Sequence, residues 1–262
     1  MRILQFFLIV FVFFLLLPAA LAQTACKRLI AYGNPEYPPY LWNSKNGSDN
    51  MMGANADFIK LLAQEIGLPI AVKYGGTWAR VQEEARYGRV DLVAGAFVTQ
   101  ERKKYLHYFY PAIFQTRTII WVHRDRKFPF KEWSDLKSKN GITVLNNSFG
   151  EKFDKYAKVN LQIQTVASLA QAFNMLKNNR AQYLIYEEWP AKAYALRYKY
   201  DELIPLSPEI SNEALFLAFS KKSPCNAPEL RAKIEHAIMK ISKKEVLEKL
   251  LIDNSRAWEH EN

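Results

Sequence analysis

The sequence predicts an α/β protein of two lobes, with mainly parallel sheets covered by helices and a cleft between the lobes. Two observations lead to this fold class. Short apolar strands and amphipathic helices alternate along most of the chain, which is typical of parallel sheets with helices on both faces. This rhythm breaks and restarts near residues 113–117 and again near 207–213, which indicates one lobe inserted into another. A cleft between lobes is a usual place for a small-molecule site.

The N-terminus has the pattern of a secretory signal peptide over residues 1–22. Arg2 is its only charge, an apolar run follows, and Ala20 and Ala22 occupy the small-residue positions before a cleavage site. We therefore expect cleavage near Ala22 and an exported mature protein. The alternative is an uncleaved membrane anchor. A lipid anchor on Cys26 would need an aliphatic residue at the position of Gln23, and we set it aside.

Charge and composition exclude several classes of protein. The chain has a formal net charge of +10, but its Lys and Arg residues are scattered singly or in pairs among many carboxylates. Nucleic-acid binding needs a concentrated basic stripe, so we expect no nucleic-acid partner. The four histidines show no metal-ligand spacing, and no Ser/His/Asp or Cys/His set occurs. We expect no metal and no cofactor.

Two cysteines occur, Cys26 near the mature N-terminus and Cys225 near the last helices. In an oxidising compartment a disulfide between them is the natural interpretation. The alternative is two unrelated thiols. A bond would tie the two ends of the chain into one unit.

Local signals predict the elements of the first lobe in order. A helix over 54–66 carries Phe58, Leu62 and Ile66 on one face and stops at Gly67. The aromatic loop 34–42 before it contains three prolines, which stiffen it. The other predicted elements of this part are strands at 27–32, 70–74 and 90–93 and a helix at 77–86.

The second lobe begins at a β-branched, strongly apolar run over 116–122. Strands at 141–145, 162–166 and 183–186 then alternate with helices at 150–158, 168–177 and 188–198. A strand at 214–220 and helices at 227–241 and 245–252 return to the first lobe. The predicted division is 23–115 and 211–262 for the first lobe and 116–210 for the second.

The segment from Gly95 to Arg102 is a turn-like run that follows a short buried strand and opens a helix. An arginine at this place suits the capture of a carboxylate. Its planar guanidinium binds both oxygens, and the free N–H groups at the helix start add to the attraction. The alternative is a surface arginine in the first turn of a helix.

Several segments, in this order, resemble the periplasmic solute-binding proteins of the polar amino-acid class, extracellular family 3. The resemblance covers essentially the whole mature chain, and its segments are the Tyr37–Tyr40 loop, 56–59, Trp78, 88–91, the Thr99–Arg102 motif with Pro111, and 142–148. It implies a two-lobed periplasmic-binding-protein type II fold with a hinge between the lobes. It also implies a monomer that binds a small molecule.

The resemblance implies roles for particular residues in the cleft. Arg102, in the motif that Thr99 opens, would hold the carboxylate of the ligand. Tyr37 and Trp78 would line the body of the ligand. Ser148 would add a hydroxyl and backbone donors to the same carboxylate.

A carboxylate of the second lobe is implied as the partner of the ligand's ammonium. Glu187 occupies the place where the family usually has an aspartate. Glu188 is an almost equal candidate, because the alignment there can slip by one residue. A carboxylate at a helix N-terminus, favoured by the helix dipole, is the alternative for Glu187.

The sequence departs from the family pattern at two places. Phe97 stands where a Ser or Thr hydroxyl commonly faces the ligand, and Asn146–Asn147 replaces a glycine-containing turn before Ser148. Both changes bear on the ligand, since a phenyl ring makes the pocket more apolar. The ligand that the sequence predicts is therefore either a polar amino acid or an aromatic, amine-bearing or otherwise modified carboxylate.

The function that the resemblance implies is capture of an amino-acid-like or carboxylate-bearing ligand for an inner-membrane ABC permease, without catalysis. The alternatives are a periplasmic enzyme on the same scaffold, similar to a cyclohexadienyl dehydratase with Glu187 or Glu188 as general acid, and a ligand-sensing module. Fold alone does not separate them.

Overall fold

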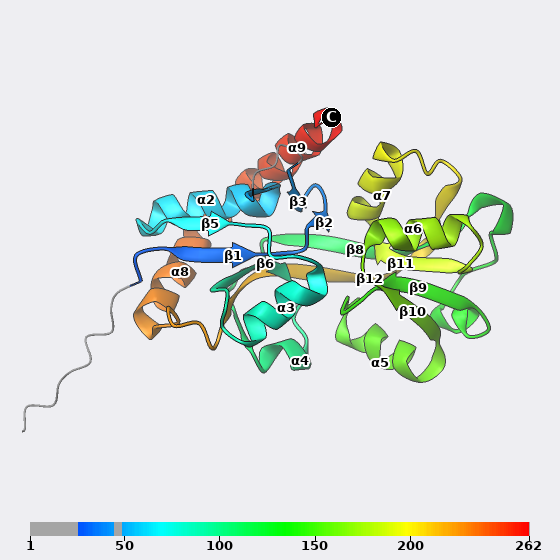
Figure 1. Ribbon diagram of the computed structural model, residues 1–262, viewed down its shortest axis with the longest axis horizontal. Coiled ribbons are helices and arrows are strands. Elements are labelled where there is room, and N and C mark those ends of the chain that lie inside the picture. The colour runs from blue at the N-terminus through cyan, green and yellow to red at the C-terminus, as the bar shows by residue number, and fades with distance from the viewer. Residues whose placement is uncertain (1–25, 45–48, 262) are drawn as a thin grey trace, which may run out of the picture.

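The computed structural model describes residues 26–44 and 49–261 of the chain. It consists of two halves that two long strands connect (Figure 1). The predicted signal peptide, residues 1–22, lies outside the described residues. None of the described helices combines the length and the apolar composition that crossing a membrane requires.

The first half contains one end of the main sheet, a small separate sheet and the helices around them. Its elements are β1 (Leu29–Tyr32), β2 (Glu36–Tyr37), β3 (Leu41–Asn43), β4 (Met51–Met52), α2 (Ala54–Ile66), β5 (Ile70–Val72), α3 (Trp78–Arg86), β6 (Leu92–Ala96), α4 (Gln100–Lys103), β7 (Leu106–Tyr108), α8 (Pro228–Ile241) and α9 (Lys244–His260).

The second half contains the other end of the main sheet with helices packed around it (Figure 1). Its elements are β9 (Asn140–Val144), α5 (Glu151–Asn160), β10 (Gln162–Val166), α6 (Leu169–Lys177), β11 (Tyr183–Glu187) and α7 (Glu188–Arg197), preceded by two 3-10 turns, η1 (Arg124–Arg126) and η2 (Trp133–Leu136).

The two connecting strands, β8 (Phe114–His123) and β12 (Leu203–Ser220), lie at the centre of the main sheet. The strand order is β10-β9-β11-β8-β12-β6-β1-β5, and β7 pairs with β12. The pairs at both ends of this order are parallel, whereas β8 and β12 run antiparallel to each other and to their other neighbours. The predicted α/β fold is confirmed, and the strands at both ends of the sheet are parallel as expected. The antiparallel strands at the centre of the sheet were not predicted.

The length of β12 is the clearest departure from the predicted elements. A strand was expected only over 214–220, whereas β12 begins at Leu203 and pairs with β8 and then with β6 and β7. The extra residues carry Pro205, Ser207 and Pro208, which disfavour a strand locally. Pairing with β8 outweighs that local preference, with a break in register between Leu206 and Ser211. The predicted lobe boundaries fall within β8 and β12, and the division into lobes stays a prediction.

Helix ends follow the local signals closely. α2 has the predicted bounds and stops at Gly67, whose φ of 62° is left-handed and whose N–H reaches the carbonyls of Ala63 and Gln64. The Ser168 side chain accepts from the Gln171 N–H and so caps α6. Capping residues act within a few positions of the helix end, and the sequence therefore reveals them.

The last helix is longer than predicted. α9 runs over Lys244–His260, where 245–252 was expected. Its additional turns carry Trp258, which is buried against Trp42 of the first half and Tyr194 of the second half. Packing of an apolar face contributes most of the stability of a helix in a folded protein, and this packing partner is distant in sequence.

Cys26 and Cys225 form a disulfide, with their Cα atoms 5.6 Å apart across 199 residues of sequence. The predicted bond is therefore present in the structure. It joins the segment before β1 to the segment before α8, within the first half.

Candidate functional site

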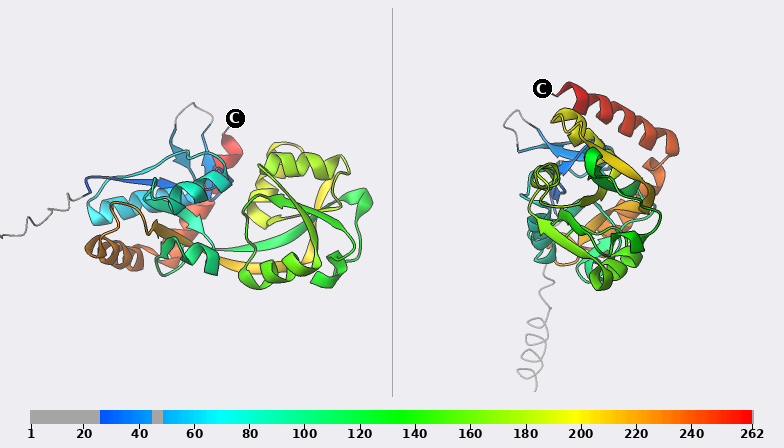
Figure 2. Two further views of the ribbon diagram at one scale, coloured as in Figure 1. Left: turned by 60° about the horizontal axis from the view of Figure 1, so that its bottom comes forward. Right: turned by 90° about the vertical axis from the view of Figure 1, so that its right-hand side faces the viewer.

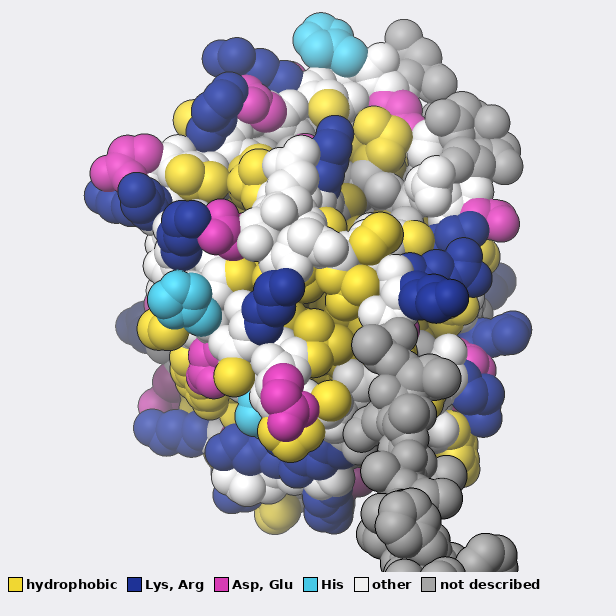
Figure 3. Space-filling view, turned by 90° about the vertical axis from the view of Figure 1, so that its left-hand side faces the viewer, with side chains coloured by type: hydrophobic (Ala, Val, Ile, Leu, Met, Phe, Trp, Pro, Cys, Tyr) yellow, Lys and Arg dark blue, Asp and Glu magenta, His cyan; other side chains and the backbone are white. Residues whose placement is uncertain are grey.

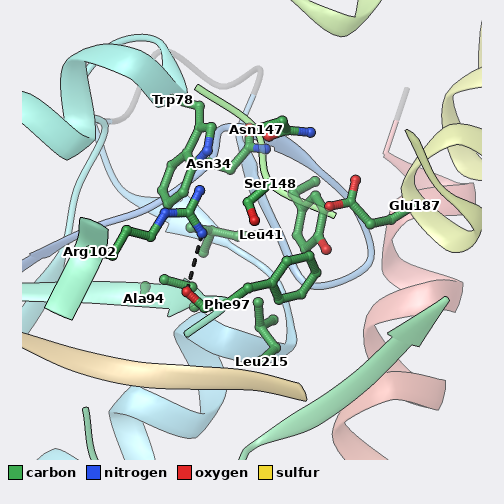
Figure 4. A pocket seen from close by; sticks show the side chains of 13 residues that line it. Asn34, Leu41, Trp78, Ala94, Phe97, Arg102, Asn147, Ser148, Glu187 and Leu215 are labelled. Carbon is green, nitrogen blue, oxygen red and sulfur yellow. Dashed lines mark hydrogen bonds between the residues drawn. The ribbon is translucent and has the colours of Figure 1, made fainter. Parts of the chain in front are cut away.

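A pocket of about 340 Å³, including its mouth, lies between the two halves. This volume is at the small end of the range for ligand pockets. Both halves and the strand β12 contribute to its walls (Figure 4). The lining residues are Asn34, Tyr37, Leu41, Trp78, Ala94, Gly95, Ala96, Phe97, Arg102, Asn147, Ser148, Glu187 and Leu215.

Arg102 enters this pocket from the first turn of α4. The strand β6 is buried along its whole length and delivers the chain to Thr99, whose hydroxyl accepts from the Arg102 N–H at 3.1 Å and caps the helix. Arg102 itself is only 5% exposed. Thr99 thus acts on the backbone beneath Arg102 and does not line the pocket.

The Arg102 guanidinium binds neutral oxygens only. Nε donates to Gln82 Oε1 at 3.2 Å, and Nη1 donates to the Phe97 carbonyl at 3.3 Å (Figure 4). Nη2 donates to the Asn146 carbonyl of the second half at 3.1 Å. Among the described residues no carboxylate lies within 4 Å of it, whereas a buried cation usually has an anionic partner. It therefore has no direct ion pair inside the pocket, and its charge acts on the carboxyls of Glu187 and Asp154 only from beyond that distance.

Trp78 supports the same guanidinium from one side. Its ring centroid lies 5.3 Å from Arg102 Cζ, within the range of a cation–π contact. Trp78 is the first residue of α3, which Thr77 caps. It is 5% exposed and forms part of the pocket wall.

Glu187 lies on the opposite side of the pocket from Arg102, as Figure 4 shows. It is the last residue of β11, opposite Thr118 of β8, and is 3% exposed. Burial raises the pKa of its carboxyl to about 8, and the positive charge of Arg102 offsets only part of that rise. Its Oε2 has no hydrogen-bond partner among the described residues.

Tyr37 lies near the Glu187 carboxyl without completing a hydrogen bond to it. The tyrosine slightly lowers the pKa of Glu187, yet its hydroxyl and Glu187 Oε2 both lack a hydrogen bond of normal geometry. Buried polar groups in proteins are usually hydrogen-bonded, so these two atoms are candidate contacts for a donor on a ligand.

Ser148 belongs to the pocket, but its hydroxyl is engaged elsewhere. It donates to Asp154 Oδ2 of α5, and the Phe149 N–H donates to Oδ1 of the same carboxylate at 2.9 Å. The hydroxyl hydrogen therefore points to α5. The neighbouring Asn147 presents a buried side-chain amide nitrogen, which has no hydrogen-bond partner in the part of the chain that the structure describes.

Phe97 forms the floor between Arg102 and Glu187, above Leu215 (Figure 4). It is 4% exposed and directly precedes the segment that leads to α4. A large ring at this place reduces the free volume and removes polar partners. The arrangement favours a short ligand.

Glu188 lies outside the pocket. It pairs with Arg117 of β8 at the surface and begins α7. Glu187 ends a strand and Glu188 starts a helix, so their side chains leave the backbone on different sides. Of the two candidate carboxylates, only Glu187 lines the pocket.

The structure adds polar residues that the sequence did not single out. Gln82 orients Arg102 and also donates to the Asn146 carbonyl at 3.1 Å. Asn34 donates to the Tyr186 hydroxyl at 3.2 Å, across the two halves. Gln82 could have been found from the sequence as a polar residue on an apolar face of its helix. For Asn34 the sequence gives no signal beyond its place in the aromatic loop.

On most of the face that Figure 3 shows, Lys and Arg side chains are spread among acidic and apolar ones, and they gather most closely along its lower edge. Among residues 26–44 and 49–261, no group of three or more His, Cys, Asp or Glu residues has the arrangement of a metal site.

Comparison with known proteins gives one family and many similar structures. A family model described as bacterial extracellular solute-binding proteins, family 3, matches residues 29–253. No curated protein sequence matches the chain. A histidine kinase sensor domain with similarity to periplasmic binding proteins is 18% identical, with a TM-score of 0.74, and the match covers 87% of this chain and 95% of that one.

Two similar structures are of proteins bound to arginine. An ancestral arginine-binding protein is 22% identical, with a TM-score of 0.73, over 87% of this chain and 98% of that one. An amino-acid ABC transporter substrate-binding protein from Streptococcus pneumoniae is 20% identical, with a TM-score of 0.72, over 88% of this chain and 96% of that one. The TM-scores establish the shared fold, and the family model covers most of the sequence. The chain therefore belongs to the bacterial extracellular solute-binding proteins, family 3.

Proposed function

We propose that this protein binds a short amino-acid-like ligand between its halves and delivers it to an inner-membrane ABC permease. The observation that carries the proposal is the buried Arg102 guanidinium without a carboxylate partner, opposite Glu187 in the same pocket. A ligand carboxylate would replace the Asn146 carbonyl as the partner of Arg102. A charge-assisted bond of this kind is stronger than the neutral one it replaces.

The other wall suits a group that donates hydrogen bonds. Glu187 Oε2 and the Tyr37 hydroxyl are both without partners, and an ammonium group provides donors for both. Trp78 and Phe97 would enclose the short apolar part of the ligand. The proposed ligand-binding set is thus Arg102, Asn147, Trp78, Tyr37, Phe97 and Glu187, with Ser148 contributing its backbone.

The proposed setting is the periplasm. Family 3 binding proteins are typically exported, and residues 1–22 have the composition of a cleaved signal peptide. We propose that the protein acts as a monomer that closes on its ligand. Closure follows when ligand contacts to both halves favour the closed population.

The test is a thermal-shift screen against amino acids, polyamines and small organic acids, since a ligand that binds only the native state raises its stability. Calorimetry then compares Arg102→Ala with the control Arg89→Ala. Arg89 is 54% exposed and pairs with Glu84 in the same half. Loss of Arg102 should weaken binding by about 3 kcal/mol, or roughly two orders of magnitude in Kd. Equal affinities in the two variants would contradict the proposed site.

A second candidate function is catalysis on the same scaffold. The raised pKa of Glu187 favours it, because a carboxyl that holds its proton near neutral pH can serve as a general acid. The substrate class would be a carboxylated ring, as in cyclohexadienyl dehydratases. Turnover of prephenate by the purified protein, lost in Glu187→Gln, would establish this alternative.

The third candidate function, ligand sensing, is consistent with the similarity to the histidine kinase sensor domain, which is a likeness of fold. Co-purification from membranes distinguishes it from transport. A permease among the partners supports delivery, and a signalling protein supports sensing.

A further inference from the structure

The end of α9 joins the two halves at a place remote from the pocket floor. α9 packs along α2 of the first half, and its last turns contact α7 of the second half. In the left view of Figure 2, β8 and β12 connect the halves along the lower side, and the C-terminal end of α9 lies on the upper side beside α7. A rotation about the connecting strands that opens the cleft would pull this contact apart.

Trp258 is the centre of the contact and is 7% exposed. Its ring makes an edge-to-face contact with Trp42 of the first half, with the ring centroids 5.5 Å apart. It also stacks on Tyr194 of α7, with the ring centroids 5.6 Å apart. Its indole Nε1 donates to the main-chain oxygen of Ala193 at 3.2 Å. One side chain thus makes both an aromatic stack and a hydrogen bond across the two halves.

Charged groups extend the same contact. Arg197 of α7 places its Cζ 3.9 Å from the Trp258 ring centroid, and its Nη1 lies 3.6 Å from Glu261 Oε2. Glu261 Oε2 also accepts from Trp42 Nε1 at 2.5 Å. A cation–π contact of a largely desolvated arginine adds to the attraction between the halves. We call Trp42, Trp258 and Glu261 of the first half, with Tyr194 and Arg197 of the second, the α9 clasp.

The α9 clasp differs in kind from the contacts inside the pocket. The bond from Arg102 to Asn146 uses a group that a ligand carboxylate would take over. The clasp residues do not line that pocket, so a ligand there leaves their contacts intact. The contribution of the clasp to closure is therefore present with or without ligand.

We propose that the α9 clasp stabilises the closed arrangement independently of ligand and thereby sets the ligand affinity, with Trp258 as a positioning residue. The effect on affinity rests on the proposed binding function; the effect on closure does not. When only a fraction of the protein is competent to bind, the apparent Kd rises by the inverse of that fraction. A tenfold fall in the closed fraction would weaken apparent binding about tenfold.

The experiment measures closure without any ligand. Spin labels on cysteines introduced at Lys60 of α2 and Val159 of α5, both exposed, report the distance between the halves by electron–electron double resonance. The native cysteines are bonded to each other and do not take the label. Trp258→Ala should move the distance distribution of the unliganded protein to longer values, and Trp258→Phe should move it less.

The matched control is Trp133→Ala. Trp133 packs on Phe153 and donates to the Ile210 carbonyl, away from the α9 clasp. Its loss should lower the melting temperature and leave the distance distribution unchanged. Arg197→Met removes the cation from the clasp and serves as a second variant if Trp258→Ala does not fold. The proposal would be overturned if Trp258→Ala and Arg197→Met both gave the wild-type distance distribution. If Trp258→Ala cannot be made, a wild-type distribution in Arg197→Met alone would overturn it. That result would leave the proposed ligand binding through Arg102 untouched.

Discussion

Arg102 Nη2 and the main-chain oxygen of Asn146 lie 3.1 Å apart, although the two residues belong to opposite halves of the molecule. Asn146 has a left-handed backbone, with φ at 62°, and its carbonyl also accepts from Gln82 Nε2. A neutral oxygen thus occupies the place that we assign to a ligand carboxylate. Ligand binding in the pocket is then an exchange of partners at Arg102.

Gln82 should matter for this exchange, because its side-chain oxygen Oε1 accepts a hydrogen bond from Arg102 Nε. The residue is buried, with 6% of its surface exposed. Gln82→Ala frees the guanidinium to rotate, and we expect ligand affinity to fall by about 1 kcal/mol, the net value of one buried hydrogen bond. Calorimetry with a ligand from the thermal-shift screen measures the change. Gln164→Ala on the exposed strand β10 is the control. Unaltered binding in Gln82→Ala would show that Arg102 needs no such support.

Glu187 should make the unliganded protein less stable as the pH rises. Its pKa in the folded protein is about 8, above the ordinary value of 4.5, so its contribution to stability is complete below pH 4.5 and is lost as the pH rises through 8. Glu187→Gln keeps the shape without the titration. The stability of this variant relative to wild type should therefore increase between about pH 5 and pH 8 and then level off.

Urea unfolding at several pH values measures that difference. Glu188→Gln, one residue further on and paired with Arg117 at the surface, is the control and should follow the wild-type profile. A constant difference between Glu187→Gln and wild type over this range would mean that Glu187 is ionised in the folded protein.

Phe97 should limit the size of the ligand. Phe97→Ser removes the ring between Arg102 and Glu187, and longer or more polar amino acids should then appear among the thermal-shift hits. Loss of a buried phenyl ring also costs about 3 kcal/mol of stability. Phe216→Ser removes a ring that packs on Tyr108 and Tyr110 and does not line the pocket. If both variants lose stability and neither changes the set of ligands, Phe97 has no role in specificity.

The Cys26–Cys225 bond should contribute substantially to stability, because it closes a loop of 199 residues. The chain-entropy estimate for a loop of that length is about 5 kcal/mol, which sets an upper bound. Cys26→Ser with Cys225→Ser should therefore lower the urea midpoint without changing the ligand profile. Reductant should destabilise the wild type and have no effect on the double variant. A wild-type midpoint in the double variant would show that the bond constrains nothing.

The predicted elements and the observed ones agree where the signal is local. The bounds of α2 follow from the spacing of Phe58, Leu62 and Ile66 and from Gly67. Ser168 marks the start of α6, and Thr99 marks the start of α4 before Arg102. In each case the residues that determine the end of an element lie within one turn of it, so the sequence alone contains the information.

The errors lie where a partner is distant in sequence. β12 begins 11 residues before the predicted strand because β8 pairs with it, and α9 continues past residue 252, its added turns packing through Trp258 on Trp42 and Tyr194. The choice between Glu187 and Glu188 has the same origin. A shift of one residue in a strand moves a side chain to the other face, and the pairing of β11 with β8 and β9 sets that register.

By itself the sequence determined the order of the longer strands and helices, the family and the presence of Arg102 at the start of a helix, since these depend on composition and on neighbours along the chain. It did not predict the short strands β2, β3, β4 and β7, two of which begin within the expected loop 34–42. The tertiary structure decided what Arg102 binds, that the Ser148 hydroxyl serves Asp154, and that Trp258 joins the two halves. Hydrogen bonds and aromatic contacts act over a few ångströms in space, whatever the separation in sequence. Which groups meet is therefore a property of the folded chain.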